Sequence, residues 1–192
     1  MRYPPPVLSL LLACASAPSS GTAPPMDGAR DHVEQAGAWT ANVRGGTLTI
    51  TRDGVTRDLG GGVLPELAWS GDSLVYPQGD LDERDLLVVE LPTGAPRRLT
   101  DWPGYEDRPV WSPDGTRVAF FAGRTGLPSL YLLDIATGAV TQLTNVGVSP
   151  RGPRPGVPPD GFAPPPDSGT ATWAGSTLTW TARGQPITVV AQ

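Results

Sequence analysis

Two segments of the chain are nearly the same, and this repetition restricts the fold more than any other feature of the sequence. The first segment reads WSGDSLVY from Trp69, and the second reads WSPDGTRVAF from Trp111. Each is followed by an aliphatic run, then by a Thr-Gly pair at Thr93 or Thr137, and then by a Leu-Thr pair. Matching positions lie about 43 residues apart, which is typical of architectures built from repeated structural units.

Each copy of the repeat predicts four short antiparallel strands. In the second copy they are residues 110–111, 117–121, 130–135 and 139–143. β-Forming residues dominate these segments. Between the first two strands, Pro113, Asp114 and Gly115 suit a tight turn, because proline fixes φ early in the turn and glycine ends it. A four-stranded antiparallel sheet at this spacing is one blade of a β-propeller, so we predict an all-β, propeller-type fold.

Weaker copies of the repeat flank the two clear ones. Residues 173–180 resemble the start of a blade, and residues 187–190 resemble its third strand. Near the other end, residues 47–51 and 55–59 predict the last two strands of a blade, with a further strand at 39–43. We therefore expect about three to four blades in an incomplete or open propeller. Its unpaired edges favour association with copies of the chain or with a neighbouring protein.

The residues around the second copy resemble a known family. The sequence DRPVWSPDG from Asp107, followed by VAF, LY and QLT, is similar to the WD40-like (PD40-type) repeat of TolB-type β-propellers. The similarity is close over residues 99–144 and good over residues 65–100. It implies that the motif tryptophans wedge between blades and that Asp114 and Gly115 form the turn. The structural positions that it assigns are Trp69, Trp111, Pro113, Asp114, Gly115 and Trp173.

The resemblance is specific for the fold and carries no catalytic role, and we predict a non-enzymatic envelope protein that acts as a protein-interaction or scaffold module. Similar repeats also occur in the propellers of prolyl-oligopeptidase-like enzymes, in which a separate hydrolase domain carries the chemistry. The sequence contains no Gly-x-Ser-x-Gly nucleophile motif, so we assign no catalytic residue. The alternatives are a detached, gating propeller of such an enzyme, or a non-functional fragment of a longer propeller.

The first residues resemble a bacterial export signal. Arg2 precedes a short apolar run at residues 7–13, which is far shorter than the roughly 20 residues that cross a membrane. The sequence Leu-Leu-Ala-Cys, which ends at Cys14, resembles a lipobox, in which the cysteine thiol accepts a lipid. We therefore predict a signal peptide at residues 1–14 with Cys14 as the lipid attachment site. The alternative is cleavage after Ala17 and secretion.

The rest of the chain divides into two parts. Residues 15–36 are rich in Ala, Ser, Pro and Gly and predict a flexible tether, and residues 37–192 predict the propeller-like domain. A Pro-rich insertion with eight prolines interrupts this domain at residues 145–171. From the export signal and the tether, we expect a protein of the cell envelope that is anchored by a lipid and faces the periplasm.

The composition excludes several kinds of site. The net charge is −5 and all 14 basic residues are arginine, so no basic stripe for nucleic acid is present. One Cys and one His exclude an internal disulfide and a zinc site of the usual Cys/His type. We therefore predict no metal and no cofactor.

Two loops of the expected propeller carry candidate partner-binding residues. The loop between the second and third strands of the first clear blade is acidic, and the loop that leads into the next blade holds aromatic and acidic residues. The candidates are Asp80, Asp82, Glu83, Asp85, Trp102, Tyr105 and Glu106. Acidic charge on one face favours a cationic or basic partner, whereas charge runs of this kind are more often solvated loops.

Overall fold

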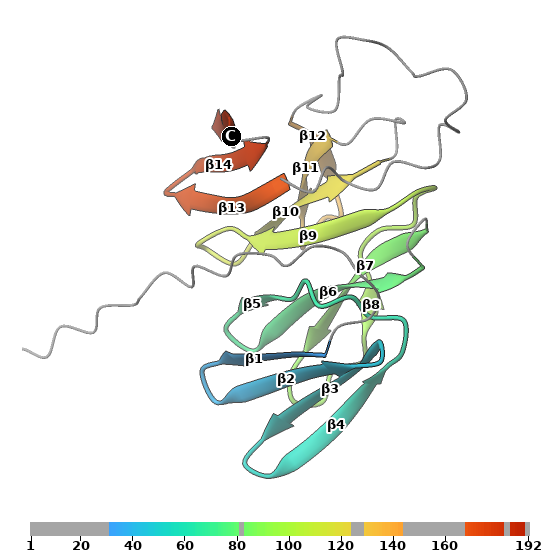
Figure 1. Ribbon diagram of the computed structural model, residues 1–192. Coiled ribbons are helices and arrows are strands. Elements are labelled where there is room, and N and C mark those ends of the chain that lie inside the picture. Colours follow the sequence, from blue (N-terminus) through green and yellow to red (C-terminus); the bar gives the residue numbers. More distant parts are fainter. Residues whose placement is uncertain (1–30, 81–82, 124–128, 144–167, 183–184, 191–192) are drawn as a thin grey trace, which may run out of the picture.

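The structure is a computed structural model that describes residues 31–80, 83–123, 129–143, 168–182 and 185–190. Within these ranges the chain forms strands β1 to β15 and no helix. The strands make four separate antiparallel sheets, and in each sheet the spatial order of the strands follows their order in the chain. Figure 1 shows β1–β4 at the bottom, β5–β8 above them and then β9–β12, with β13 and β14 at the upper left.

Each sheet is a meander whose strands follow one another directly. Sheet 1 contains β1 (His32–Ala36), β2 (Trp39–Arg44), β3 (Thr47–Arg52) and β4 (Val55–Gly60), and sheet 2 contains β5 (Ala68–Ser70), β6 (Ser73–Gly79), β7 (Arg84–Glu90) and β8 (Arg97–Arg98). Sheet 3 contains β9 (Glu106–Trp111), β10 (Arg117–Ala122), β11 (Ser129–Asp134) and β12 (Val140–Gln142), and sheet 4 contains β13 (Ser168–Ala174), β14 (Thr177–Ala182) and β15 (Gln185–Val190).

The architecture confirms the prediction of an all-β fold with open propeller blades. The hairpin predicted at residues 47–59 is β3 and β4, and it pairs within sheet 1. The two flanking partial copies therefore form sheets of their own. Residues 1–30 and 144–167, with the predicted signal peptide, Cys14 and most of the Pro-rich insertion, lie outside the described residues.

One part of the predicted tether is wrong. Residues 32–36, assigned to the tether at 15–36, form strand β1 and pair with β2 from His32 opposite Val43 to Ala36 opposite Trp39. The strand lacks an apolar alternation of its own, because only half-buried and exposed positions alternate along it. Its partner β2 holds it in place through the two-residue turn at Gly37, whose φ is +59°. Similarly, residues 168–171 of the predicted insertion belong to β13.

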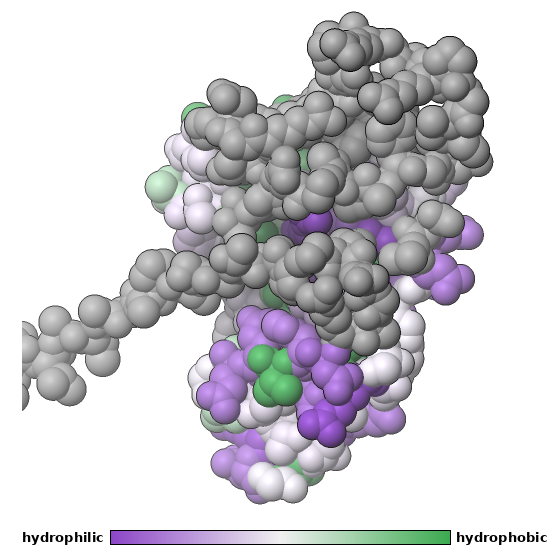
Figure 2. Space-filling view, viewed as in Figure 1, coloured by the Kyte–Doolittle hydropathy of each residue, from purple (hydrophilic) through white to green (hydrophobic). Residues whose placement is uncertain are grey.

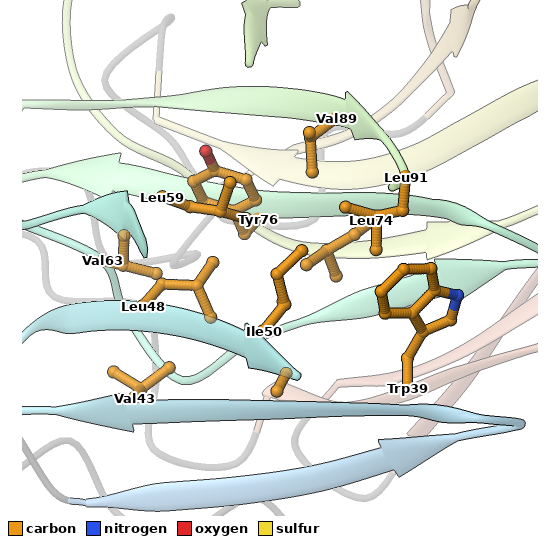
Figure 3. Packing of buried hydrophobic residues seen from close by; sticks show 11 residues of the cluster. Trp39, Val43, Leu48, Ile50, Leu59, Val63, Leu74, Tyr76, Val89 and Leu91 are labelled. Atoms are coloured by element: carbon orange, nitrogen blue, oxygen red, sulfur yellow. The ribbon is translucent and has the colours of Figure 1, made fainter. Parts of the chain in front are cut away.

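The core consists of three apolar clusters, each of which fills the space between two consecutive sheets. Figure 3 shows the first cluster, where Leu48 and Ile50 of sheet 1 lie against Leu74 and Tyr76 of sheet 2. These four side chains are at most 1% exposed. Since both faces of sheets 2 and 3 are covered, their central strands are apolar on both sides, as in β6 and β10.

The outside of the molecule is mostly polar. Figure 2 shows hydrophilic and neutral colours over most of the coloured surface, with hydrophobic colour in small separate spots. The described residues include three large apolar side chains with high exposure, namely Val33, Val55 and Val190. No helix in the described ranges is long and apolar enough to cross a membrane.

Candidate functional site

The WSPDG motif joins two sheets. The indole Nε1 of Trp111, on β9, donates a hydrogen bond to the backbone oxygen of Ala68, on β5, at 3.0 Å. Trp111 is 9% exposed and belongs to the cluster between sheets 2 and 3. The residue therefore lies between blades, in the position that the family resemblance implies.

The turn after Trp111 is fixed by Asp114. The carboxylate oxygen of Asp114 accepts hydrogen bonds from Ser112 Oγ at 2.5 Å, from Thr116 N at 3.1 Å and from Thr116 Oγ1 at 2.9 Å. These donors, that of Ser112 above all, lower the pKa of Asp114 to about 2. Gly115 follows with a φ of +68°. The Ser and Asp of the motif thus close a turn and have no catalytic partner among the described residues.

The equivalent turn in sheet 2 is shorter and leaves a hollow. Gly71 and Asp72 alone connect β5 to β6, and Asp72 accepts a hydrogen bond from the indole of Trp39 in sheet 1 at 2.8 Å. A cavity of about 390 Å³ is lined by Ala36, Gly37, Ala38, Trp39, Arg52, Trp69, Gly71 and Asp72. The guanidinium of Arg52 lies 5.0 Å from the centre of the Trp39 ring. The ionisable side chains of the lining are Arg52 and Asp72, and both are engaged with neighbours, Arg52 over the Trp39 ring and Asp72 with the Trp39 indole.

The structure separates the acidic residues of the first predicted loop. Asp80 and Glu83 are exposed, and Asp82 lies outside the described residues. Asp85 pairs with Arg98 at 2.8 Å and accepts a hydrogen bond from Thr100 Oγ1 at 3.2 Å. In the described part of the chain, no three metal-ligating side chains come together.

The aromatic and acidic residues of the second predicted loop point inward. Trp102 is half-buried, with its ring centre 5.9 Å from that of Phe120 and 5.4 Å from that of Tyr131. Tyr105 is 7% exposed and Glu106 is fully buried. In this conformation neither Tyr105 nor Glu106 can touch a partner, contrary to the expectation for an exposed loop.

A buried ionic cluster, defined by Glu66, Arg84, Asp107 and Arg108, lies where sheet 2 leads into sheet 3. Arg84 Nη2 donates to Asp107 Oδ2 at 2.5 Å, and their side chains are 1% and 0% exposed. Arg108 Nε lies 4.0 Å from Glu66 Oε1, and both of these side chains are largely covered. Tyr105 packs beside the cluster, with the Arg84 guanidinium 5.2 Å from its ring centre.

Two carboxyl groups of this region keep their protons to unusually high pH. Burial raises the pKa of Glu66 to about 7, the nearby charge of Asp107 acts in the same direction, and Arg108 and Arg84 oppose it. Burial also raises the pKa of Glu106 to about 8, opposed by Thr100 and supported by Asp85. Perturbed acids often mark functional sites. Here both carboxyl groups are largely covered, so their protonation is coupled to folding.

Sequence reasoning placed Arg84 in a solvated acidic loop and missed the cluster. The only local signal is the spacing of Arg84, Leu86 and Val88, which puts all three on one buried face of β7. A charged residue in phase with two buried aliphatic residues indicates a buried counter-charge elsewhere in the chain.

Known proteins share this sequence pattern and this fold. No family model matches the chain. A protein TolB homolog of Chlorobium luteolum is 32% identical over 96 residues, which cover 46% of this chain and 19% of that protein. A Tol-Pal system protein TolB of Francisella tularensis subsp. holarctica is 28% identical over 81 residues, which cover 40% of this chain and 19% of that protein. The chain thus spans about a fifth of the length of these relatives.

Solved structures agree with the sequence relatives. The crystal structure of TolB from Acinetobacter baumannii matches with a TM-score of 0.54 and 19% identity, over 76% of this chain and 35% of that chain. The structure of putative TolB from Agrobacterium tumefaciens matches with a TM-score of 0.54 and 21% identity, over 75% of this chain and 50% of that chain. The chain therefore resembles TolB in sequence over part of its length, and its fold over most of its length is that of TolB-like β-propeller blades.

Proposed function

We propose that the protein is a non-enzymatic interaction module of the cell envelope, with a TolB-like set of blades that contacts another protein. The observation that carries this proposal is the likeness to TolB in both sequence and fold, because a relative bears the name of a Tol-Pal system protein. The repeated motif supports a scaffold role, since its Trp, Ser, Asp and Gly are engaged in sheet packing and turn closure.

The partner surface that we propose is the loop end of sheets 2 and 3, defined by Asp80, Glu83 and Asp101. All three residues are exposed, and the Asp101 side chain is 90% exposed. Half-buried Trp102 follows Asp101 and offers an apolar contact at the rim. A partner with a basic patch fits this surface, because opposite charge steers encounter and fixes orientation.

The experiment that tests this surface is site-specific photo-crosslinking in the native envelope. A photoreactive residue at Glu83 is expected to give one discrete protein adduct, and the double change Asp80→Lys/Asp101→Lys is expected to abolish it. A photoreactive residue at Glu90 is the matched control, because Glu90 is also exposed but ends β7, at the opposite end from Glu83. Adducts of equal yield from both positions, or none from Glu83, contradict the proposed surface.

We also propose that Cys14 carries a lipid that tethers the module to the membrane. The proposal is supported by Arg2, by the apolar run at 7–13 and by the presence of a single cysteine in the chain. Metabolic labelling with a fatty acid tests it directly. Label is expected in the wild-type protein and not in Cys14→Ser, and label that persists in the variant overturns the anchor.

A further inference from the structure

The two end sheets each have a face that no described sheet covers. In sheet 1, the inward side chains are Trp39, Ala41 and Val43, so the alternate residues of β2 point outward. In sheet 4, the inward side chains of β14 are Leu178 and Trp180, which pack against sheet 3. We call the two uncovered faces the outward face of sheet 1 and the outward face of sheet 4.

On the outward face of sheet 1, polar residues occupy the positions that hold a tryptophan and aliphatic residues in sheets 2 and 3. Its cross-strand row runs Gln35, Thr40, Thr51 and Thr56. The structurally equivalent row is Trp69, Leu74 and Val89 in sheet 2, and Trp111, Val118, Leu133 and Val140 in sheet 3. In sheets 2 and 3 this row packs on the preceding sheet. In sheet 1 the tryptophan position holds glutamine, and the aliphatic positions hold threonine.

The outward face of sheet 4 shows the same replacement from the other side. Its cross-strand row is Thr172, Thr179 and Thr188. The equivalent rows, which face the following sheet, are Ala68, Val75 and Val88 in sheet 2, and Val110, Ala119 and Leu132 in sheet 3. Positions that hold alanine, valine or leucine in sheets 2 and 3 thus hold threonine in sheet 4.

Threonine keeps the strand geometry while changing what the face can contact. Its β-branched shape is close to that of valine, so it suits a strand as well as valine does. Its hydroxyl must remain hydrogen-bonded if the face is covered, which a blade surface of Trp, Leu and Val cannot provide. On sheet 1, Thr51 Oγ1 and Thr56 Oγ1 lie 2.8 Å apart and share one hydrogen bond, so one of their two hydroxyl protons still needs an acceptor. Thr49 Oγ1 donates to the backbone oxygen of Asn42 at 3.4 Å.

We infer that both outward faces are capping surfaces that meet water, so that the four sheets do not stack end to end with a second copy of the chain. Arrays of repeats need such polar outer faces at their ends to stay soluble. The inference goes beyond the proposed function, because these faces lie apart from the loop end of sheets 2 and 3. It narrows the self-association that the sequence left open, since it removes stacking of blade faces and leaves association through the unpaired strand edges.

The experiment measures molar mass by light scattering during size exclusion, over about a hundredfold range of protein concentration. The expected result for the wild type is the mass of a single chain at every concentration. A dimer or ring that Thr40→Lys/Thr179→Lys dissociates overturns the inference. An oligomer that survives these substitutions is held elsewhere and leaves both faces in water, as inferred.

A gain of association gives the complementary test. Thr40→Leu/Thr51→Val copies the residues of sheet 2 onto the outward face of sheet 1, and we expect it to produce concentration-dependent dimers. The matched control is Thr93→Leu/Thr116→Val, which adds the same groups at exposed turns. Equal behaviour of the two variants overturns the inference. Circular dichroism confirms that each variant retains its sheets. Loss of the photo-crosslink at Glu83 contradicts only the proposed partner surface, so the two failures are distinguishable.

Discussion

Arg84 and Asp107 form a buried ion pair between sheets 2 and 3, with Nη2 and Oδ2 2.5 Å apart. The two residues are 23 positions apart in the chain, one at the start of β7 and the other near the start of β9. The pair therefore ties two blades together at the end where the candidate partner loops lie.

The first prediction concerns this pair. Asp107→Asn removes the buried charge that Arg84 contacts, and we expect it to lower the free energy of unfolding by about 3–5 kcal/mol. Urea unfolding followed by circular dichroism measures the change. Asp101→Asn is the control, because that side chain is 90% exposed, and the expected change is within about 0.5 kcal/mol.

A double substitution separates the pair from the general packing of the site. Arg84→Met/Asp107→Leu replaces both charges with apolar groups, and the expected stability is above that of Asp107→Asn alone. If the double variant is no more stable than the single one, the uncompensated charge is not the cause of the loss.

The second prediction is that stability falls as pH rises through neutrality. Glu66 and Glu106 have folded-state pKa values of about 7 and about 8, above the value of 4.5 for an ordinary glutamate. The folded state therefore binds more protons than the unfolded state in this window, so the stabilisation is complete below the unfolded pKa and is lost as pH rises through the folded pKa. Urea midpoints are expected to be higher at about pH 5 than at about pH 8.5.

Single substitutions assign the pH dependence to these groups. Glu66→Gln and Glu106→Gln remove the titrating carboxyl groups, and each is expected to flatten the profile between pH 5 and pH 8.5. Asp114 provides an internal contrast, because its pKa of about 2 is lowered and its contribution is lost only in acid. A wild-type profile that rises with pH through neutrality contradicts the prediction.

The sequence predicted the blades because the repeat is a local pattern. The turn at Pro113 and the flanking apolar strands are encoded within a few residues, so their copies identify a blade wherever they occur. Strand β1 was missed because HVEQA has no apolar alternation and depends on its pairing with β2. Tertiary pairing decided the structure of that segment, not the preference of its own residues.

The candidate site was less predictable because distant residues define it. Arg84 stands in the acidic sequence DERD, yet it is buried against Asp107 and Tyr105, which lie elsewhere in the chain. Tyr105 is buried because Gly123 leaves room for its ring, since a Cβ at Gly123 would lie 2.6 Å from a carbon of that ring. No pattern within a single loop contains these two relationships.

The third prediction tests the hydrogen bond of the repeat tryptophan. Trp111→Phe keeps an aromatic ring between sheets 2 and 3 but leaves the backbone oxygen of Ala68 without the indole donor. We expect a loss of about 1 kcal/mol from the hydrogen bond, in addition to the loss from the smaller ring. Trp69→Phe is the matched control, because the buried Nε1 of Trp69 has no hydrogen-bond partner among the described residues. If thermal unfolding shows equal losses in the two variants, the hydrogen bond contributes nothing measurable.

The fourth prediction concerns Gly123, which follows β10 and contacts Tyr105. Gly123→Ala places a methyl group where the buried Tyr105 ring lies, with ring carbons at 2.6, 3.0 and 3.1 Å from the added Cβ. The ring cannot move freely, since it packs beside Arg84, so we expect destabilisation of about 1–3 kcal/mol from overpacking. Gly61→Ala is the control, because a Cβ there meets nothing within 4 Å and the backbone φ is not positive. Chemical denaturation of both variants measures the difference. Tyr105→Leu added to Gly123→Ala is expected to recover part of the loss, and a Gly123→Ala variant as stable as Gly61→Ala contradicts the close packing of Tyr105.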